Sequence, residues 1–252
     1  MSSEQTLIAY TLRLADNALI LSQRMVELVA AGPELEEELA NANFALDFIG
    51  QARMFYAHAG HLEGQGRKED DFAFMRDEHE FRNLLMLEQP NGHFGDALVR
   101  QYLFEAYYFH VLEALTKCSD HGLVEIAERA IKEVKYHLRH SSQWLIRLGD
   151  GTPLSHERAQ QALNDLWRYT GEMFAVDEID TSMQADHAGP DLAGIYQLWR
   201  DDVAATVAQA TLTLPDDEWM ASGGKQGQHS EHLGFILSEM QYLQRSFPGA
   251  TW

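Results

Sequence analysis

Apolar residues recur at three- and four-residue spacing along most of the chain, and this period predicts α-helices. In the first 150 residues the pattern predicts four long helices, over residues 7–31, 34–61, 94–117 and 123–148. Gly32-Pro33 separates the first two helices, and Ser119-Asp120-His121-Gly122 forms a tight turn between the last two. We therefore expect two helix hairpins.

The segment that joins the hairpins is long. Residues 64–91 are rich in charged side chains, begin with two glycines and end in Pro90-Asn91-Gly92, so we expect a long connection with at most a short helix. The order of hairpin, long crossover and hairpin is typical of a ferritin-like four-helix bundle with one long crossover.

The last hundred residues also show a helical pattern. Ser155 is a candidate cap for a helix to about residue 175, and residues 176–190 are acidic and read as irregular. Further helices are expected over 191–212 and 229–247, and no strand-period alternation is long enough to predict a sheet. We expect an all-α protein with one ferritin-like domain over residues 1–252, in which residues 1–150 form the bundle core and 151–252 a helical extension.

Composition narrows the class of protein. The chain has 252 residues, of which 45% are hydrophobic and 23% charged, as in ordinary globular proteins. The net charge of −20 argues against partners that are nucleic acid or an anionic membrane surface. The lone Cys118, the absence of a signal-peptide pattern and the absence of a membrane-length apolar run predict a cytoplasmic protein.

Each predicted hairpin places two acidic residues at one level. Asp16 and Asp47 lie equally far from the first turn, and Glu105 and Glu133 lie equally far from the second. Because the helices of a hairpin run antiparallel, each pair should lie at the same height, roughly 22 Å from its turn at 1.5 Å of rise per residue. The four residues interrupt apolar seams, so we expect a layer of four carboxylates inside the bundle.

Such a layer resembles the carboxylate ligands of a di-metal site. Di-iron carboxylate bundles use one carboxylate from each of two helices and a Glu-x-x-His motif from each of the other two. Here Gly50 stands three residues after Asp47, Tyr136 stands three residues after Glu133, and His137 falls one position late. A metal pair at these residues would lack ligands. We expect a vestigial layer of Asp16, Asp47, Glu105, Glu133 and His137, with no metal, cofactor-binding or catalytic residue in this chain.

Without metal, the carboxylates should be satisfied by protonation, by ordered water or by ion pairs with nearby Arg, Lys or His137. Arg13 is one candidate partner for Asp16 or Glu105. The alternative is an independent, atypical di-iron or di-manganese oxidase built on the same five residues. Metal storage is a third hypothesis and the least favoured.

Three other features carry weaker predictions. Residues 223–227, Gly-Gly-Lys-Gln-Gly, lack the spacing of a phosphate-binding loop and read as a flexible surface loop or a partner contact. Ser230 is the expected cap of the last helix. A basic run on the fourth helix reads as a solvated face or, alternatively, as a surface for an acidic partner: Lys132, Lys135, Arg139, His140 and Arg147.

Several long segments resemble the structural, or C, subunit family of the multicomponent phenylacetyl-CoA 1,2-epoxidase, and the resemblance runs from about residue 7 to the C-terminus. These segments are YTLRLADNALILSQR (10–24), ALDFIGQAR (45–53), LLMLEQPNGHFGDALVRQY (84–102), IKEVKYHLRHSSQWLIRLGDGT (131–152), LWRYT (166–170), GGKQGQHSEHLG (223–234) and EMQYLQRSFPGATW (239–252).

The resemblance implies a role in a complex. In that family a related ferritin-like catalytic A subunit holds the di-iron centre and the phenylacetyl-CoA, and the C subunit supports it without a competent metal site. The resemblance implies two further partners, a small B subunit and an NADPH-dependent flavin and iron–sulfur reductase, and a complex that inserts one oxygen atom of O2 into the aromatic ring. The sequence does not decide whether the isolated chain forms a homodimer.

The third predicted helix carries aromatic residues on two faces. Phe104 and Tyr107 point away from the seam that contains Tyr102, Glu105 and Phe109. We expect this second face, with Phe104 and Tyr107, to pack against the catalytic subunit.

Overall fold

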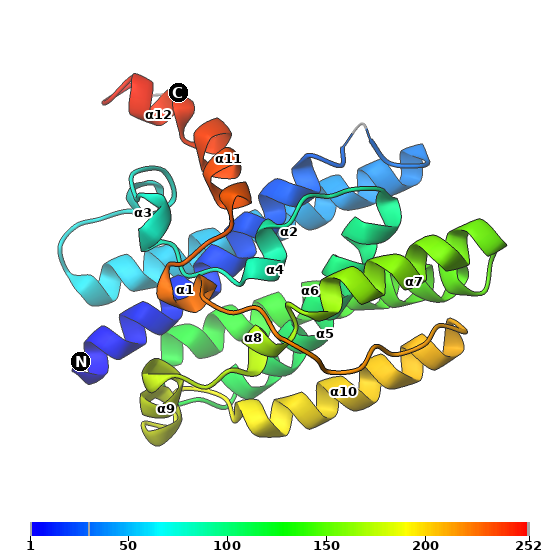
Figure 1. Cartoon of the computed structure of the whole chain (residues 1–252). Helices are drawn as coiled ribbons and strands as arrows, with labels where there is room; N and C mark the ends of the chain where they lie inside the picture. The colour runs from blue at the N-terminus through cyan, green and yellow to red at the C-terminus, as the bar shows by residue number, and fades with distance from the viewer. Residues whose placement is uncertain (1, 30, 251–252) are drawn as a thin grey trace.

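The computed structural model describes residues 2–29 and 31–250, and every regular element in these ranges is helical (Figure 1). The all-α prediction is therefore confirmed. None of the described helices is long and apolar enough to cross a membrane.

The first hairpin consists of α1 (Ser3–Val26) and α2 (Leu35–Glu63). Ser2 caps α1 by accepting a hydrogen bond from the backbone N–H of Gln5. Gly64 ends α2 with a left-handed backbone, φ 65°, which glycine adopts without a steric penalty. The prediction placed the end of the first helix at residue 31, whereas α1 ends at Val26 and residue 31 lies in the turn.

The second hairpin consists of α5 (Phe94–Leu115) and α6 (His121–Gly149), and Asp120 caps α6 through the N–H of Leu123. The helices of each hairpin pack along each other, and α2 also packs against α6. The connection between the hairpins holds only short helices, close to the prediction: α3 (Glu69–Phe74), the 3₁₀ helix η1 (Glu78–Glu80) and α4 (Leu85–Glu88).

The C-terminal hundred residues pack against the hairpins. Helices α7 and α10 contact α5 and α6, whereas α9 and α11 contact α1 (Figure 1). The elements of this part are α7 (Pro153–Trp167), α8 (Gly171–Phe174), α9 (Glu178–Ala185), α10 (Leu192–Gln209), η2 (Gly224–Gln226), α11 (Glu231–Met240) and α12 (Tyr242–Ser246).

Three boundary predictions in this part were wrong. Thr152, and not Ser155, caps the helix, which starts at Pro153 and ends at Trp167. The acidic segment expected to be irregular contains α9, because Asp177 accepts hydrogen bonds from two backbone N–H groups at its start. The last predicted helix is broken at Gln241, whose side chain donates to the carbonyls of Ala73 and Arg76, both at 3.0 Å.

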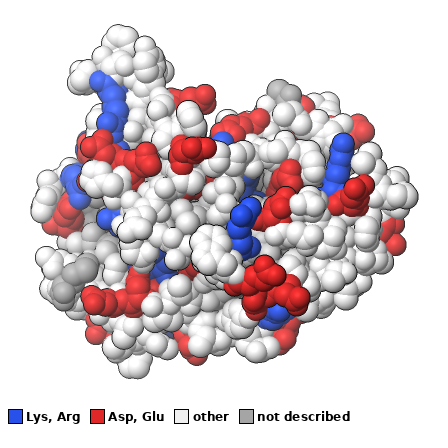
Figure 2. Space-filling model, in the orientation of Figure 1, with Lys and Arg blue, Asp and Glu red and all other residues white. Residues whose placement is uncertain are grey.

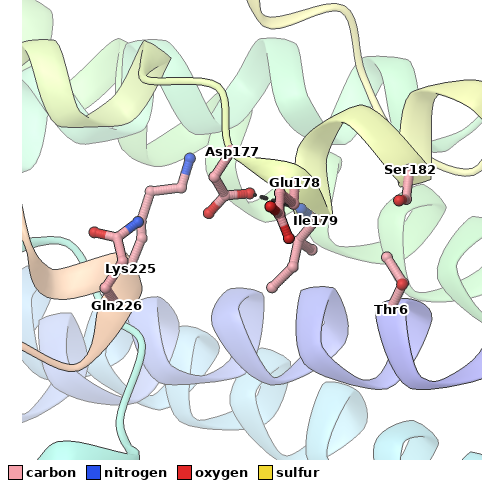
Figure 3. Close-up of a pocket in the computed structure, with 7 residues that line it drawn as sticks. All are labelled: Thr6, Asp177, Glu178, Ile179, Ser182, Lys225 and Gln226. Atoms are coloured by element: carbon pink, nitrogen blue, oxygen red, sulfur yellow. Dashed lines mark hydrogen bonds between the residues drawn. The ribbon is translucent and has the colours of Figure 1, made fainter. Parts of the chain in front are cut away.

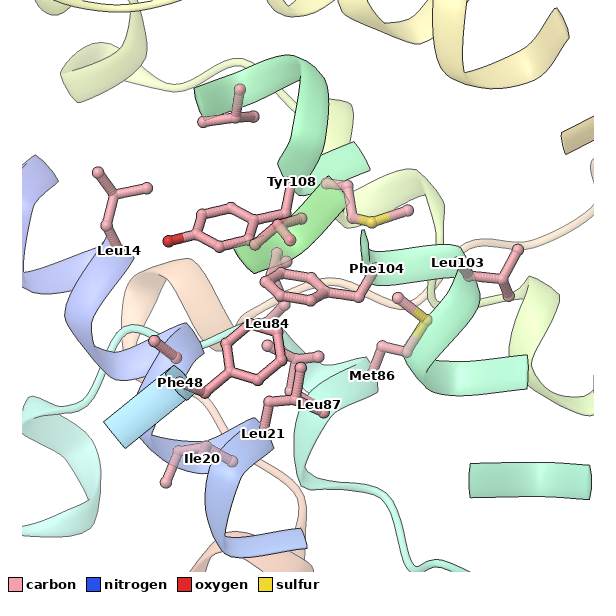
Figure 4. Packing of buried hydrophobic residues seen from close by; sticks show 14 of the residues in the cluster. Leu14, Ile20, Leu21, Phe48, Leu84, Met86, Leu87, Leu103, Phe104 and Tyr108 are labelled. Carbon is pink, nitrogen blue, oxygen red and sulfur yellow. The ribbon is translucent and has the colours of Figure 1, made fainter. Parts of the chain in front are cut away.

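The core between the hairpins is aromatic. The rings of Phe48, Phe104 and Tyr108 gather between α2 and α5, with Leu84 of the connection beside them (Figure 4). Trp199 of α10 is fully buried, stacks on Trp167 of α7 and donates a hydrogen bond to the carbonyl of Leu103. The extension therefore shares a core with the two hairpins.

A buried carboxylate fixes the loop at residues 222–228. One oxygen of Glu172 accepts hydrogen bonds from the N–H groups of Gly223 (2.9 Å) and Gly224 (2.7 Å), and the other accepts from Leu85 (2.8 Å). Gly224 is required here, because a Cβ would lie 2.2 Å from the carbonyl oxygen of Asn83. The prediction of a flexible surface loop was wrong, since Gly224 and Lys225 are buried.

Replacing Glu172 with alanine is expected to destabilise the fold by about 1–3 kcal/mol, because several buried N–H groups lose their acceptor. Urea unfolding gives the stability, and amide hydrogen exchange at residues 223–225 should become faster. The exposed Glu157 of α7 supplies the control, Glu157→Ala. Equal effects of the two substitutions would show that Glu172 does not hold the loop.

Candidate functional site: the carboxylate layer

Asp16 of α1 is fully buried and already has its partners. Its carboxylate accepts hydrogen bonds from Tyr56 Oη (2.6 Å) and from the N–H of Arg82 (2.8 Å), and it forms an ion pair with Arg76. The predicted partner Arg13 instead binds Asp177 and Asp180 of α9. Asp16 thus ties α1 to α2 and to the connection between the hairpins.

Asp47, His137 and Glu105 form a chain of contacts that runs from the surface into the core. His137 Nε2 lies 3.0 Å from Asp47 Oδ2, and His137 Nδ1 lies 3.7 Å from Glu105 Oε1. The Asp47 side chain is 41% exposed, whereas the side chains of His137 and Glu105 are 0% exposed. The structure therefore brings three of the five predicted residues together.

Glu105 is held by neutral donors. Its oxygens accept hydrogen bonds from Gln101 Nε2 (2.8 Å) and Ser141 Oγ (2.7 Å). Burial raises the pKa of Glu105 to about 8, although these two hydrogen bonds lower it. Burial also lowers the pKa of His137, an effect that Asp47 opposes. At neutral pH the arrangement favours a protonated Glu105 beside a neutral imidazole.

Glu133 belongs to a separate pair. Its Oε2 accepts a hydrogen bond from Gln51 Nε2 (2.9 Å), and Arg129 lies 3.8 Å from the other oxygen. Burial, with a contribution from the charge of Asp47, raises the pKa of Glu133. Nearby, the buried Tyr108 hydroxyl has no hydrogen-bond partner among the described residues.

These residues do not fit a di-metal centre. Among residues 2–29 and 31–250, no three His, Cys, Asp or Glu side chains converge as metal ligands would. The position three residues after Asp47 is Gly50, where a Cβ would meet no atom within 4 Å, and Tyr136 is 56% exposed. The guanidinium of Arg76 places a positive charge against Asp16, where a di-metal centre would place a cation of its own.

Sequence reasoning missed several members of this site. Gln51 stands one turn after Asp47 and Ser141 one turn after His137, so helical spacing could have identified both. Arg76 lies in the irregular connection, and no local pattern places it beside Asp16, 60 residues earlier in the chain.

The Gly-Gly-Lys-Gln-Gly segment does not provide an anion site. A surface pocket of about 360 Å³ lies between α1 and α9, next to Lys225 and lined by Thr6 and Asp177 (Figure 3). The Lys225 ammonium donates to Asp180 Oδ2 and to the carbonyl of Ala175, both at 2.7 Å. The positive charge of Lys225 is therefore paired with Asp180 inside the fold.

The role expected for Ser230 was wrong. Its side chain makes no capping hydrogen bond at the start of α11, and its backbone N–H donates to Glu88 Oε1 at 2.6 Å. The neighbouring His229 Nδ1 lies 2.9 Å from Glu88 Oε2. These two residues therefore satisfy a buried carboxylate of α4.

The expectation that Phe104 faces a partner is also wrong. Phe104 is 0% exposed, and its ring stacks on Tyr108 with centroids 5.2 Å apart. Tyr107 packs edge-on against Phe174 of α8, with centroids 5.4 Å apart. The core between α2 and α5 therefore buries Phe104, and the extension covers Tyr107, which accounts for the second aromatic face of α5.

Charge on the surface is mostly negative. On the face seen in Figure 2, Asp and Glu are spread over the molecule and Lys and Arg are few, as the net charge of −20 requires. This face offers no continuous basic track for a phosphate backbone.

Comparison with known proteins identifies the family. The whole chain, residues 1–252, matches the family described as phenylacetic acid catabolic protein. The chain belongs to this family. Among phenylacetic acid catabolic proteins, it is 48% identical over 246 residues to the C subunit of the 1,2-phenylacetyl-CoA epoxidase of Escherichia coli (strain K12). The match covers 98% of this chain and 99% of that protein, which confirms the resemblance in the motifs quoted above.

Proposed function

We propose that this chain is the non-catalytic structural subunit of a phenylacetyl-CoA epoxidase, a di-iron monooxygenase complex of aerobic phenylacetate degradation. The near full-length similarity to an epoxidase C subunit supports the assignment to the complex. The two packed hairpins with a long connection support a ferritin-like bundle. The non-catalytic role rests on the environment of Asp16. Its carboxylate is bound by Arg76, Tyr56 and a backbone N–H.

In this proposal the di-iron centre and the substrate belong to a related catalytic A subunit, and a small B subunit and a flavin and iron–sulfur reductase complete the complex. One oxygen atom of O2 enters the ring, and the other is reduced to water with electrons from NADPH. This chain contributes rigidity, because ligand geometry in the partner depends on well-packed supporting residues. The buried polar contacts of Asp16 and Glu105 and the shared aromatic core make it a stiff support.

Two measurements test the proposal. Ring epoxidation by the reconstituted complex should require this chain, and Asp47→Asn in this chain should leave turnover unchanged, because Asp47 holds no metal. Iron and manganese content of the isolated chain, after anaerobic incubation with excess Fe(II) or Mn(II), should be far below one ion per chain.

Two outcomes would contradict the proposal. Full epoxidation without this chain would remove its structural role. Metal content near two ions per chain, lost in Asp47→Asn, would favour the independent di-metal oxidase instead.

A further inference from the structure

The outer side of the α2–α6 pair carries large apolar side chains that face solvent. Leu39 and Leu46 of α2 are 57% and 65% exposed, and Tyr136 of α6 is 56% exposed. Leu39 and Leu46 are seven residues apart, so they lie on one stripe along α2, the spacing that a packed partner helix contacts. Tyr136 lies beside α2, since its ring packs edge-on against Phe44 with centroids 5.9 Å apart.

Basic residues surround Tyr136 on the same helix. Lys132, Lys135 and Arg139 are exposed, and their side chains make no hydrogen bond or ion pair with any residue that the structure describes. The Arg139 guanidinium lies 5.7 Å from the centre of the Tyr136 ring. In a chain of net charge −20, these three side-chain cations lie beside an exposed aromatic ring without partners among the described residues, so they are available to an acidic partner.

We propose that this outer face of α2 and α6, defined by Leu39, Leu46, Lys132, Tyr136 and Arg139, docks an acidic helical surface of the catalytic subunit. The inference rests on the proposed function and adds the surface and the chemistry of its occupant. Apolar anchors supply the centre of such an interface, and the lysine and arginine residues pair with carboxylates at its rim.

A second copy of this chain is a poorer occupant. A two-fold interface brings the same patch of both copies together, so the cations around Tyr136 would face each other. Like charges across an interface oppose association. Charge complementarity therefore favours a different protein with Asp and Glu on its helices.

The surface is tested by measuring the Kd for the purified catalytic subunit with two docking variants and two control variants. The docking variants are Leu46→Asp and the double variant Lys132→Glu/Arg139→Glu. The controls are Leu154→Asp and Arg158→Glu on α7, where Leu154 is 56% exposed and Arg158 is also exposed. Circular dichroism and the melting temperature identify any variant that fails to fold.

Each docking variant should raise the Kd about ten-fold or more, and the controls should bind like the wild type. Raising the salt concentration should weaken the wild-type complex more than the complex of the Lys132→Glu/Arg139→Glu variant, because this variant lacks the ion pairs that salt screens. If the folded docking variants bind the catalytic subunit as tightly as the wild type does, the assignment of this docking surface is wrong and the proposed function stands. If wild type does not bind, both are overturned. Self-association that the docking variants abolish, without binding to the catalytic subunit, would assign the face to a homodimer.

Discussion

Replacing Arg76 with methionine is expected to destabilise the folded chain by about 3–5 kcal/mol, because a buried carboxylate then loses its countercharge. Arg76 and Asp16 have side-chain exposures of only 5% and 0%. Arg76 also donates to the carbonyls of Phe72 (2.7 Å) and Glu80 (3.1 Å), so it holds the connection onto α1. Urea unfolding monitored by circular dichroism measures the loss.

The control is an exposed ion pair. Arg53 is 66% exposed and pairs with Glu69, so Arg53→Met should cost less than about 1 kcal/mol. Adding Asp16→Asn to Arg76→Met should restore part of the stability, because the uncompensated charge is removed. Similar losses for Arg76→Met and Arg53→Met, or no recovery in the double variant, would show that the pair does not anchor the connection.

The second large effect is a pH dependence of stability that originates at Glu105. Its pKa is about 8 in the folded chain against an ordinary value of 4.5. Between these values the folded state holds a proton that the unfolded state has released, so stability falls as pH rises through this window. The contribution, on the order of 5 kcal/mol, is fully present below the ordinary pKa and is lost above pH 8.

Glu105→Gln removes this titration and keeps the shape of the side chain. The free energy of unfolding, measured in urea from about pH 5 to about pH 9, should therefore decline less for Glu105→Gln than for the wild type. Glu128 on α6 is exposed, and Glu128→Gln should follow the wild-type profile. Parallel profiles for wild type and Glu105→Gln would mean that Glu105 is ionised in the folded state across this range.

The long helices could be predicted from the sequence because their signals are local. Apolar spacing and the turns at Gly32-Pro33 and residues 119–122 locate both hairpins. The breaks in the extension depend on distant residues. The last helix stops at Gln241 because that side chain binds carbonyls of the connection, 165 and 168 residues away in sequence. No local propensity contains that information.

The candidate site was predictable only in part, for a similar reason. Helical spacing predicts one layer of Asp16, Asp47, Glu105, Glu133 and His137, and the structure joins only Asp47, His137 and Glu105 by direct contacts. The partner of Asp16 comes from an irregular segment, Phe104 packs against Phe48 of α2, and Tyr107 packs against Phe174 of α8. A second apolar face on a helix indicates only that something covers it. Here the cover belongs to the same chain, and the exposed apolar stripe lies on α2.

The buried carboxylate of Glu88 can gain two of its hydrogen-bond partners only late in synthesis. Its partner His229 is 141 residues further along, and Ser230 supplies a second hydrogen bond. During synthesis both hairpins emerge from the ribosome before these partners exist. The connection between the hairpins can therefore reach its native hydrogen bonding only when nearly the whole chain has been made. A stalled or truncated product that ends before His229 would leave the Glu88 carboxylate with the hydrogen bond from Asn83 but without those from His229 and Ser230. Quality-control proteases can detect such a defect through local unfolding.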